Sequence, residues 1–144
     1  MATSNEQKCF YKILHEDLTH HGFTYKEGLN VDTNPWIPSR LCTGGGLYFT
    51  DKAHLAWFLG YGPKIARVCV PPDASFLCYD ESAGIYKADR IILGPIQRIK
   101  ELDVWNDREF CRSAVLQVGC ALEFVQEQSE DLCLSAARQN GSAL

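Results

Sequence analysis

The first two thirds of the chain consist of short apolar runs that Gly, Pro and Asp residues interrupt. Such runs, rich in β-branched and aromatic residues, are typical of β-strands. By this pattern residues 26–38 form a loop, because they contain Gly28, Pro35 and Pro38. The runs that predict strands are 9–14, 23–25, 47–50, 65–70, 76–79 and 86–93, and residues 96–102 form a further short extended or helical piece.

Two regions follow a helical period instead. Residues 52–59 come directly after Thr50 and Asp51, either of which can cap a helix. From residue 106 onward apolar residues recur every three or four positions, which predicts an amphipathic helix capped near Asn106 or Asp107. The apolar positions of that helix are Phe110, Ala114, Val118, Ala121, Leu122 and Val125. A second helix is expected over residues 129–138, with Ser129 as its cap.

Strands followed by helices indicate an α+β fold rather than repeated βαβ units. We expect a small, mostly antiparallel sheet with one inserted helix, followed by C-terminal helices that pack on it. In this division residues 9–138 form a single globular domain, with the sheet core at 9–104 and the C-terminal helices at 105–138. Residues 1–8 and 139–144 are expected to be disordered tails.

Composition narrows the cellular context. The chain has 144 residues, a formal net charge of −4 and seven cysteines without a CxxC pair, which favours a reducing compartment. The acidic balance does not favour nucleic acid as a partner. Residues 1–8 are polar, unlike a secretory signal, and no apolar run approaches the roughly 20 residues that span a bilayer. A cytoplasmic, or possibly nuclear, protein without a membrane partner is therefore expected, and its oligomeric state stays open.

Histidines are concentrated in one short segment. His15, His20 and His21 are three of the four histidines in the chain. Histidine is a common general acid or base and a common metal ligand. In an extended segment, adjacent His20 and His21 point in opposite directions, so at most one of them is expected to join His15. A solvated loop is the simpler interpretation, and a metal site would need a third ligand, with Asp51 or His54 as candidates; no metal is expected.

A glycine run precedes the strand at 47–50. Glycines permit positive φ and a close approach of a ligand to the backbone, although a tight turn needs them too. Tyr48 and Thr50 share one face of that strand and are expected to face a cleft, while Cys42 beside the turn is either a nucleophile or an inert thiol. The candidate ligand-binding residues are His20, His21, Tyr25, Gly44, Gly45, Gly46, Thr50 and Tyr61.

An ordered series of short motifs between Phe10 and Val104 resembles a family of small uncharacterised domains found in phages, giant viruses and fungi. That resemblance implies no function. The residues that carry it include Tyr11-Lys12, Asp17-Leu18-Thr19, Gly22 to Tyr25, Gly28, Cys42, Gly46 to Phe49, Ala66-Arg67-Val68 and Lys87 to Ile91.

The sequence Gly46-Leu-Tyr-Phe-Thr50, followed by a helix and a strand, is similar to the middle of ADP-ribosyltransferases of the poly-ADP-ribose polymerase type. The resemblance implies a split sheet and NAD as cofactor. It implies catalytic roles for Tyr48, which would stack on nicotinamide, for His15, which would bind the ribose, and for Asp89 (or Glu81) as the acid. Glu16 and Asp17 follow His15 where that family has Gly and Ser or Thr, and these carboxylates would repel a pyrophosphate.

Three functions follow as hypotheses. The first is a small intracellular binding or regulatory domain, for a small-molecule nucleotide or a protein partner, with a cleft near the Gly44–Gly46 turn and no cofactor. The second is a divergent ADP-ribosyltransferase or other NAD-using enzyme. The third is a protein-interaction domain that acts through the C-terminal helices, whose surface carries Glu123, Glu127, Glu130 and Asp131.

Overall fold

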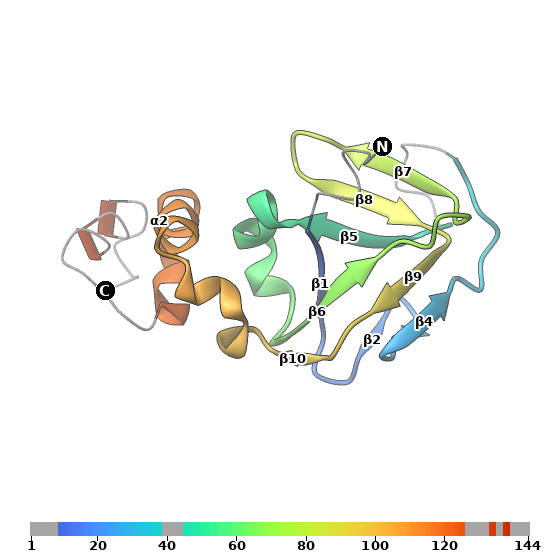
Figure 1. Ribbon diagram of the computed structural model, residues 1–144, viewed down its shortest axis with the longest axis horizontal. Coiled ribbons are helices and arrows are strands. Elements are labelled where there is room, and N and C mark those ends of the chain that lie inside the picture. Colours follow the sequence, from blue (N-terminus) through green and yellow to red (C-terminus); the bar gives the residue numbers. More distant parts are fainter. Residues whose placement is uncertain (1–8, 39–44, 126–132, 135–136, 139–144) are drawn as a thin grey trace.

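The computed structural model describes residues 9–38, 45–125, 133–134 and 137–138. Its main element is a sheet of eight strands, accompanied by a small hairpin (Figure 1). The strands of the main sheet are β1 (Phe10–Leu14), β4 (Gly28–Val31), β5 (Leu47–Asp51), β6 (Lys64–Cys69), β7 (Phe76–Asp80), β8 (Ile85–Ala88), β9 (Arg90–Leu93) and β10 (Gln97–Arg98). The hairpin pairs β2 (Thr19–His20) with β3 (Phe23–Thr24).

The sheet is strongly curled. Its strand order is β4-β9-β6-β1-β5-β8-β7, with β10 added on β6, and every pairing is antiparallel. Strands β8 and β9 are separated in sequence only by Asp89, although three other strands lie between them in the sheet. The sheet therefore bends round until these two strands meet at Asp89 (Figure 1).

Two sequence predictions about strands were wrong. Residues 86–93 form two strands instead of one, because the backbone turns at Asp89. There the Asp89 carboxylate accepts the amide of Ser75 at 2.8 Å, and its carbonyl accepts the amide of Asp32 at 2.9 Å. Residues 26–38 contain a strand, β4, where only a loop was predicted; the buried Asn30 side chain bonds the backbone of Lys26. The other predicted strands are confirmed within a residue or two.

Two apolar clusters hold the fold together. One fills the inside of the curl, where Phe10, Phe49 and Tyr86 pack their rings at centroid distances of 4.9–5.8 Å. The other lies between the sheet and the helices and includes Tyr11, Ile65 and Trp105. Neighbouring residues of β1 thus serve opposite clusters, as the two-residue period of a strand requires.

The predicted inserted helix is present as η1 (Lys52–Tyr61), a 3₁₀ helix. Of the two caps considered, Asp51 is the one used, since its carboxylate accepts the amide of His54 at 2.9 Å. The same carboxylate accepts the hydroxyl of Tyr86 and contacts Nδ1 of His54, each at 2.7 Å. Burial alone would raise the pKa of Asp51, but the bonds from Tyr86 and His54 outweigh it and lower that pKa.

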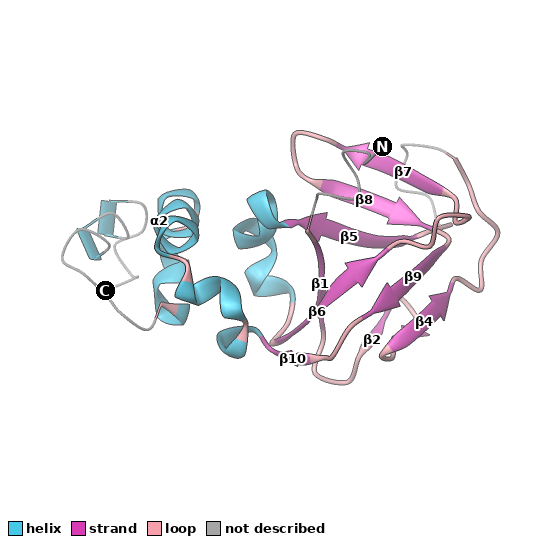
Figure 2. Ribbon diagram, viewed as in Figure 1, coloured by secondary structure: helices cyan, strands magenta, loops and turns pink. Residues whose placement is uncertain are grey.

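The C-terminal helical region lies on one side of the sheet (Figure 2). It contains η2 (Ile99–Glu101), η3 (Asp103–Asn106), α2 (Arg108–Gln117) and η4 (Gly119–Phe124). The sequence predicted a single amphipathic helix up to Val125, but the structure divides it into α2 and η4. The division occurs at Val118, which adopts an extended conformation with φ −139°. The predicted cap Asp107 is confirmed. Most of the second predicted helix, 129–138, lies outside the described residues.

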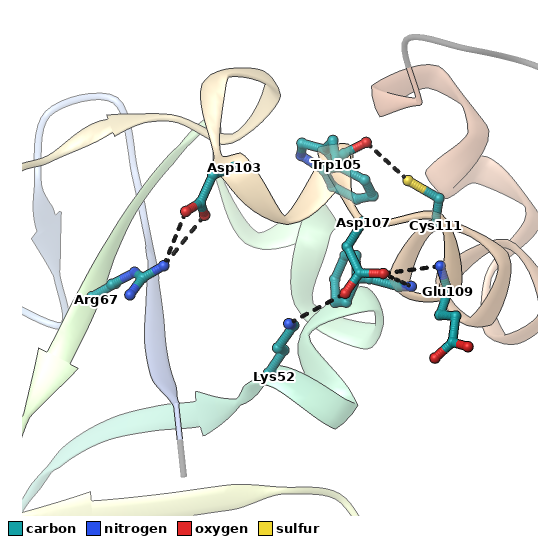
Figure 3. A network of polar contacts seen from close by, with 8 residues as sticks. Lys52, Arg67, Asp103, Trp105, Asp107, Glu109 and Cys111 are labelled. Atoms are coloured by element: carbon teal, nitrogen blue, oxygen red, sulfur yellow. Dashed lines mark hydrogen bonds and ion pairs between the residues drawn. The ribbon is translucent and has the colours of Figure 1, made fainter. Parts of the chain in front are cut away.

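Polar contacts attach these helices to the sheet (Figure 3). Arg67 of β6 forms an ion pair with Asp103 at 3.2 Å, and Lys52 lies 3.7 Å from Asp107, which also accepts the amides that begin α2. The thiol of Cys111 donates to the carbonyl of Trp105. In the described part of the chain, the structure contains no helix with the length and apolar character of a bilayer-spanning segment.

Strands β1 and β5 pair over only part of their length. Phe10 pairs with Asp51 and Tyr11 with Thr50, and beyond these two pairs the strands separate. On their other sides β1 pairs with β6 along its whole length and β5 pairs with β8 from Leu47 to Thr50. The gap between residues 12–14 and 47–49, which we call the seam, divides the sheet into two halves.

Candidate functional site

A cleft of about 640 Å³ lies along the seam. It lies within the range of about 300–1,000 Å³ that is usual for small-molecule sites. Its walls come from β1, β5, the β2–β3 hairpin and the end of η1. The residues that line it include Tyr11, Lys12, His15, His20, His21, Tyr25, Asp32, Gly45, Gly46, Tyr48, Thr50, Phe58, Tyr61 and Tyr79.

Lys12 is the polar group at the centre of the seam. It stands between Phe10 and Leu14 on the buried inner face of β1, and only 6% of it is exposed. Its ammonium donates to the carbonyl of Tyr48 at 2.6 Å, across the gap between β1 and β5. The ammonium also lies 4.5 Å from the centre of the Tyr25 ring. Burial lowers the pKa of Lys12 to about 8.

The three histidines of the sequence cluster all line this cleft. The ring of His20 lies 4.9 Å from that of His15 and 4.0 Å from that of His21. The prediction that only one of His20 and His21 could join His15 was wrong. It assumed an extended segment, whereas His21 has φ +51° and turns the chain between β2 and β3.

Basic side chains gather at this end of the cleft. The pKa of His20 is lowered first by burial and then by the positive charges of His21, Lys12 and His15. These four groups are therefore close enough to repel one another when protonated. The carboxylates that follow His15 do not offset them from within, because neither Glu16 nor Asp17 is among the lining residues.

Glu16 and Asp17 are engaged elsewhere. Glu16 forms a two-pronged ion pair with Arg98 at 2.7 and 2.9 Å, and this bond lowers its pKa. Asp17 accepts the amide of Thr19 at 3.0 Å. The repulsion of a pyrophosphate that the sequence suggested is weakened accordingly, since Arg98 neutralises one carboxylate.

The glycine turn forms one rim of the cleft. Gly45 and Gly46 have φ values of +70° and +123°, so both occupy backbone conformations that favour glycine. The amide of Gly46 donates to Asp32 at 2.6 Å, and the buried Lys87 donates to the carbonyl of Gly45 at 3.2 Å. Two side chains thus fix this rim. Gly44 and Cys42 lie outside the described residues.

Aromatic side chains line the remaining walls. Tyr48 meets Tyr79 edge to face at a centroid distance of 5.8 Å, and Phe58 meets Tyr61 at 5.5 Å. The hydroxyl of Thr50, although buried, has no hydrogen-bond partner in the described part of the chain. This end can therefore hold a flat ring and offer it a hydroxyl group.

The structure does not bring every candidate into the cleft. Asp89 forms the corner between β8 and β9 and is absent from the lining, as is Glu81. Asp51 and His54, the possible third metal ligands, bond each other instead of the histidine cluster. Among the described residues no group of three or more His, Cys, Asp or Glu side chains is arranged to hold a metal ion. The apolar side of α2 is buried among η1, η3 and η4 through Ala114 and Val115.

Sequence reasoning missed Lys12, Tyr79 and Phe58. Lys12 carried a usable signal, because a lysine inside the strand pattern Phe-Tyr-Lys-Ile-Leu occupies a position that alternation assigns to the interior. Phe58 and Tyr79 looked like ordinary core aromatics, and only the separation of β1 from β5 opens a space beside them.

Comparisons with known proteins give viral relatives. An uncharacterized protein of Acanthamoeba polyphaga mimivirus is 30% identical over 128 residues, which cover 87% of this chain and 86% of that protein. A protein of the same virus named "putative ankyrin repeat protein" is 35% identical over 103 residues, 69% of this chain. Another of that name is 32% identical over 115 residues. The chain spans 51% and 38% of these two proteins. No family model and no solved structure matches the chain.

Fold and site together define a small α+β protein whose antiparallel sheet is divided by a cleft lined with aromatic, histidine and lysine side chains. The chain belongs to the family of the uncharacterized mimivirus protein, with which it aligns over most of both lengths. The giant-virus part of the resemblance seen in the sequence is thereby confirmed.

Proposed function

We propose that this protein is a small-molecule-binding domain, with a regulatory role inside the cell, in the cytoplasm or nucleus. The ligand occupies the cleft at the seam and is an aromatic compound of nucleotide size. The observation that carries the proposal is the cleft itself, a space of about 640 Å³ between two halves of one sheet.

The lining supports an aromatic ligand. Tyr48, Tyr79, Phe58 and Tyr61 supply ring faces and edges, which bind flat rings by stacking and edge-to-face contact. A few polar groups between them fix orientation, as in most small-molecule sites. One is the buried hydroxyl of Thr50, which a ligand would provide with a hydrogen-bond partner.

The proposal is tested by thermal unfolding and calorimetric titration with adenosine, AMP and NAD. A ligand at about 100 times its dissociation constant raises the free energy of unfolding by roughly 2.7 kcal/mol, which is a clear shift of the midpoint. Tyr48→Ala should weaken binding. The matched control is Trp57→Ala, since Trp57 is 58% exposed and does not line the cleft. Equal binding by both variants, or no binding of any of these compounds at millimolar concentration, refutes the proposal.

An ADP-ribosyltransferase or another NAD-using enzyme is the second candidate. It is favoured by one observation, that His15 and Tyr48 line the same cleft. Tyr48 would then stack on the nicotinamide and His15 would bind the adjoining ribose. The acid of such an enzyme is not provided by Asp89 at the β8–β9 corner, and the carboxylate that lines the cleft, Asp32, already accepts the amides of Gly46 and Asn34.

Release of nicotinamide from NAD, followed by chromatography, separates the two candidates. An enzyme releases nicotinamide in a protein-dependent reaction that Tyr48→Ala and His15→Ala abolish while both variants stay folded. Binding of NAD without release supports the binding domain alone.

The third hypothesis is a protein-interaction domain that uses the C-terminal helices. It is supported by Leu116 of α2, an apolar side chain that is 55% exposed. The rest of the apolar side of α2 packs in the core. We therefore place the site of function in the cleft.

A further inference from the structure

We propose that the Lys12 end of the cleft is an oxyanion site, which binds a phosphate or carboxylate group of the ligand between Lys12, His15 and His20. This inference rests on the proposed function, because it assigns the charged part of the molecule whose ring the aromatic end holds. The oxyanion site requires the ligand to be an anion, whereas the aromatic lining alone would also accept a neutral compound.

Lys12 is a buried cation that has no counter-ion among the described residues. Within the described part of the chain no carboxylate forms an ion pair with it, and its ammonium contacts the neutral Tyr48 carbonyl and the Tyr25 ring. An ammonium group has more N–H donors than the single Tyr48 carbonyl accepts. Buried charges in proteins are normally paired, since taking an unpaired ion out of water is costly. A ligand oxyanion would supply the missing pair.

The histidines extend the positive site toward solvent. His15 is exposed, His20 is half-buried, and His20 is close enough to Lys12 for the two charges to interact. Three basic side chains from β1, the following turn and β2 thus converge on one end of the cleft. An oxyanion with several acceptor oxygens matches this arrangement better than a single neutral group does.

The acidic groups nearby do not already neutralise this end. Asp32 lines the cleft, but its two oxygens accept the amides of Asn34 and Gly46 at 3.1 and 2.6 Å. Asp32 helps, after burial, to raise the pKa of the Tyr25 hydroxyl, and among the described residues it forms no ion pair with Lys12. Glu16 is paired with Arg98, and Asp17 accepts the amide of Thr19.

The experiment compares probes that differ in one part each. AMP carries ring and phosphate, adenosine lacks the phosphate, and inorganic pyrophosphate lacks the ring; benzoate is added as a carboxylate probe. Each is titrated calorimetrically into the wild type, Lys12→Met and the control Lys100→Met, in which an exposed lysine that does not line the cleft is replaced. The His20 ring is followed in parallel by NMR as a function of pH.

The expected result is that Lys12→Met weakens AMP binding by about tenfold or more, as loss of a charged hydrogen bond does, and leaves adenosine binding within about twofold. Lys100→Met changes neither. Pyrophosphate should raise the pKa of His20 in the wild type, because a bound anion favours the imidazolium. The NMR readout does not depend on any variant, so it decides the question even if Lys12→Met fails to fold. A His20 pKa that pyrophosphate raises and benzoate leaves unchanged would assign the site to phosphate rather than carboxylate.

Two failures are distinguishable. If AMP and adenosine bind equally well and pyrophosphate leaves His20 unchanged, the oxyanion site is refuted while the aromatic cleft stands. If pyrophosphate binds and shifts His20 but no aromatic compound binds, the site is retained as an anion site and the proposed aromatic ligand is refuted.

Discussion

Replacement of Lys12 by methionine tests whether the seam contains an uncompensated buried charge. Methionine has nearly the same length as lysine and adapts to irregular apolar spaces, so the side chain volume is conserved. The change removes the ammonium and the hydrogen bond that crosses from β1 to the carbonyl of Tyr48. These two losses have opposite effects on stability.

The magnitude follows from the pKa of Lys12, which burial lowers from 10.5 to about 8. A depression of this size means that folding disfavours the charged form of Lys12, relative to the neutral form, by about 3 kcal/mol. Loss of the charged hydrogen bond from Lys12 to the Tyr48 carbonyl costs about 1–3 kcal/mol in the other direction. At pH 7 the Lys12→Met variant should therefore range from equally stable to about 2 kcal/mol more stable than the wild type.

The pH dependence provides the sharper measurement. Because the folded-state pKa lies below the unfolded value, the unfolded chain binds more protons between about pH 8 and 10.5, and wild-type stability gains from Lys12 as pH rises through this window. Between pH 7 and pH 10 this gain amounts to about 2–3 kcal/mol. Urea unfolding at several pH values, for wild type, Lys12→Met and Lys100→Met, measures it as a difference between curves.

Titration of other groups affects all three proteins alike and cancels in that difference. The stability advantage of Lys12→Met should fall by about 2–3 kcal/mol from pH 7 to pH 10, whereas Lys100→Met should run parallel to the wild type. Parallel curves for Lys12→Met and wild type would show that Lys12 is solvated or paired, and the argument for an uncompensated charge would be refuted.

Three further predictions concern the frame around the site. Asp107→Ala removes the cap of α2 and should lower the free energy of unfolding by about 1 kcal/mol in urea titrations; no change would mean that another group caps the helix. Gly62→Ala places a methyl group against the backbone of Leu14 and should cost about 2 kcal/mol in the same assay, unless the loop shifts without cost. Asp51→Asn weakens the hydrogen bond from Tyr86 and should reduce the loss of unfolding free energy at acid pH. A carboxylate whose pKa is lowered in the folded state stabilises the protein above its unfolded-state pKa, and this contribution is lost as pH falls through the folded-state pKa. An unchanged pH dependence would contradict this.

The sequence predicted secondary structure well where local patterns decide it. Strand β5 and the cap Asp51 follow from alternation and from capping chemistry, both of which act over a few residues. The division of residues 86–93 at Asp89 could not be predicted, since it depends on bonds to Ser75 and Asp32, which come from distant parts of the chain. Strand β4 was missed for the same reason, because its partner β9 lies about sixty residues away in sequence.

The sequence predicted several residues of the candidate site, but not Lys12 at its centre. His15, Tyr48 and Tyr61 stood out as polar or aromatic groups beside turns, and all of them line the cleft. The importance of Lys12 depends on where β1 stops pairing with β5, and no local pattern encodes that point. Asp89 was predicted as a catalytic acid from the resemblance to ADP-ribosyltransferases alone. In the structure it lies at the corner between β8 and β9.

The corner at Asp89 also governs how the chain can fold. Strand β8 completes one half of the sheet and β9 completes the other, so a single continuous segment closes both halves, and neither can bury its inner face before that segment is in place. Strands that pair in the sheet, such as β4 with β9 or β1 with β6, are far apart in sequence. Bringing them together costs loop-closure entropy before any stabilising contact forms. Folding is therefore expected to be slow and all-or-none, with the two halves protected from hydrogen exchange to the same extent.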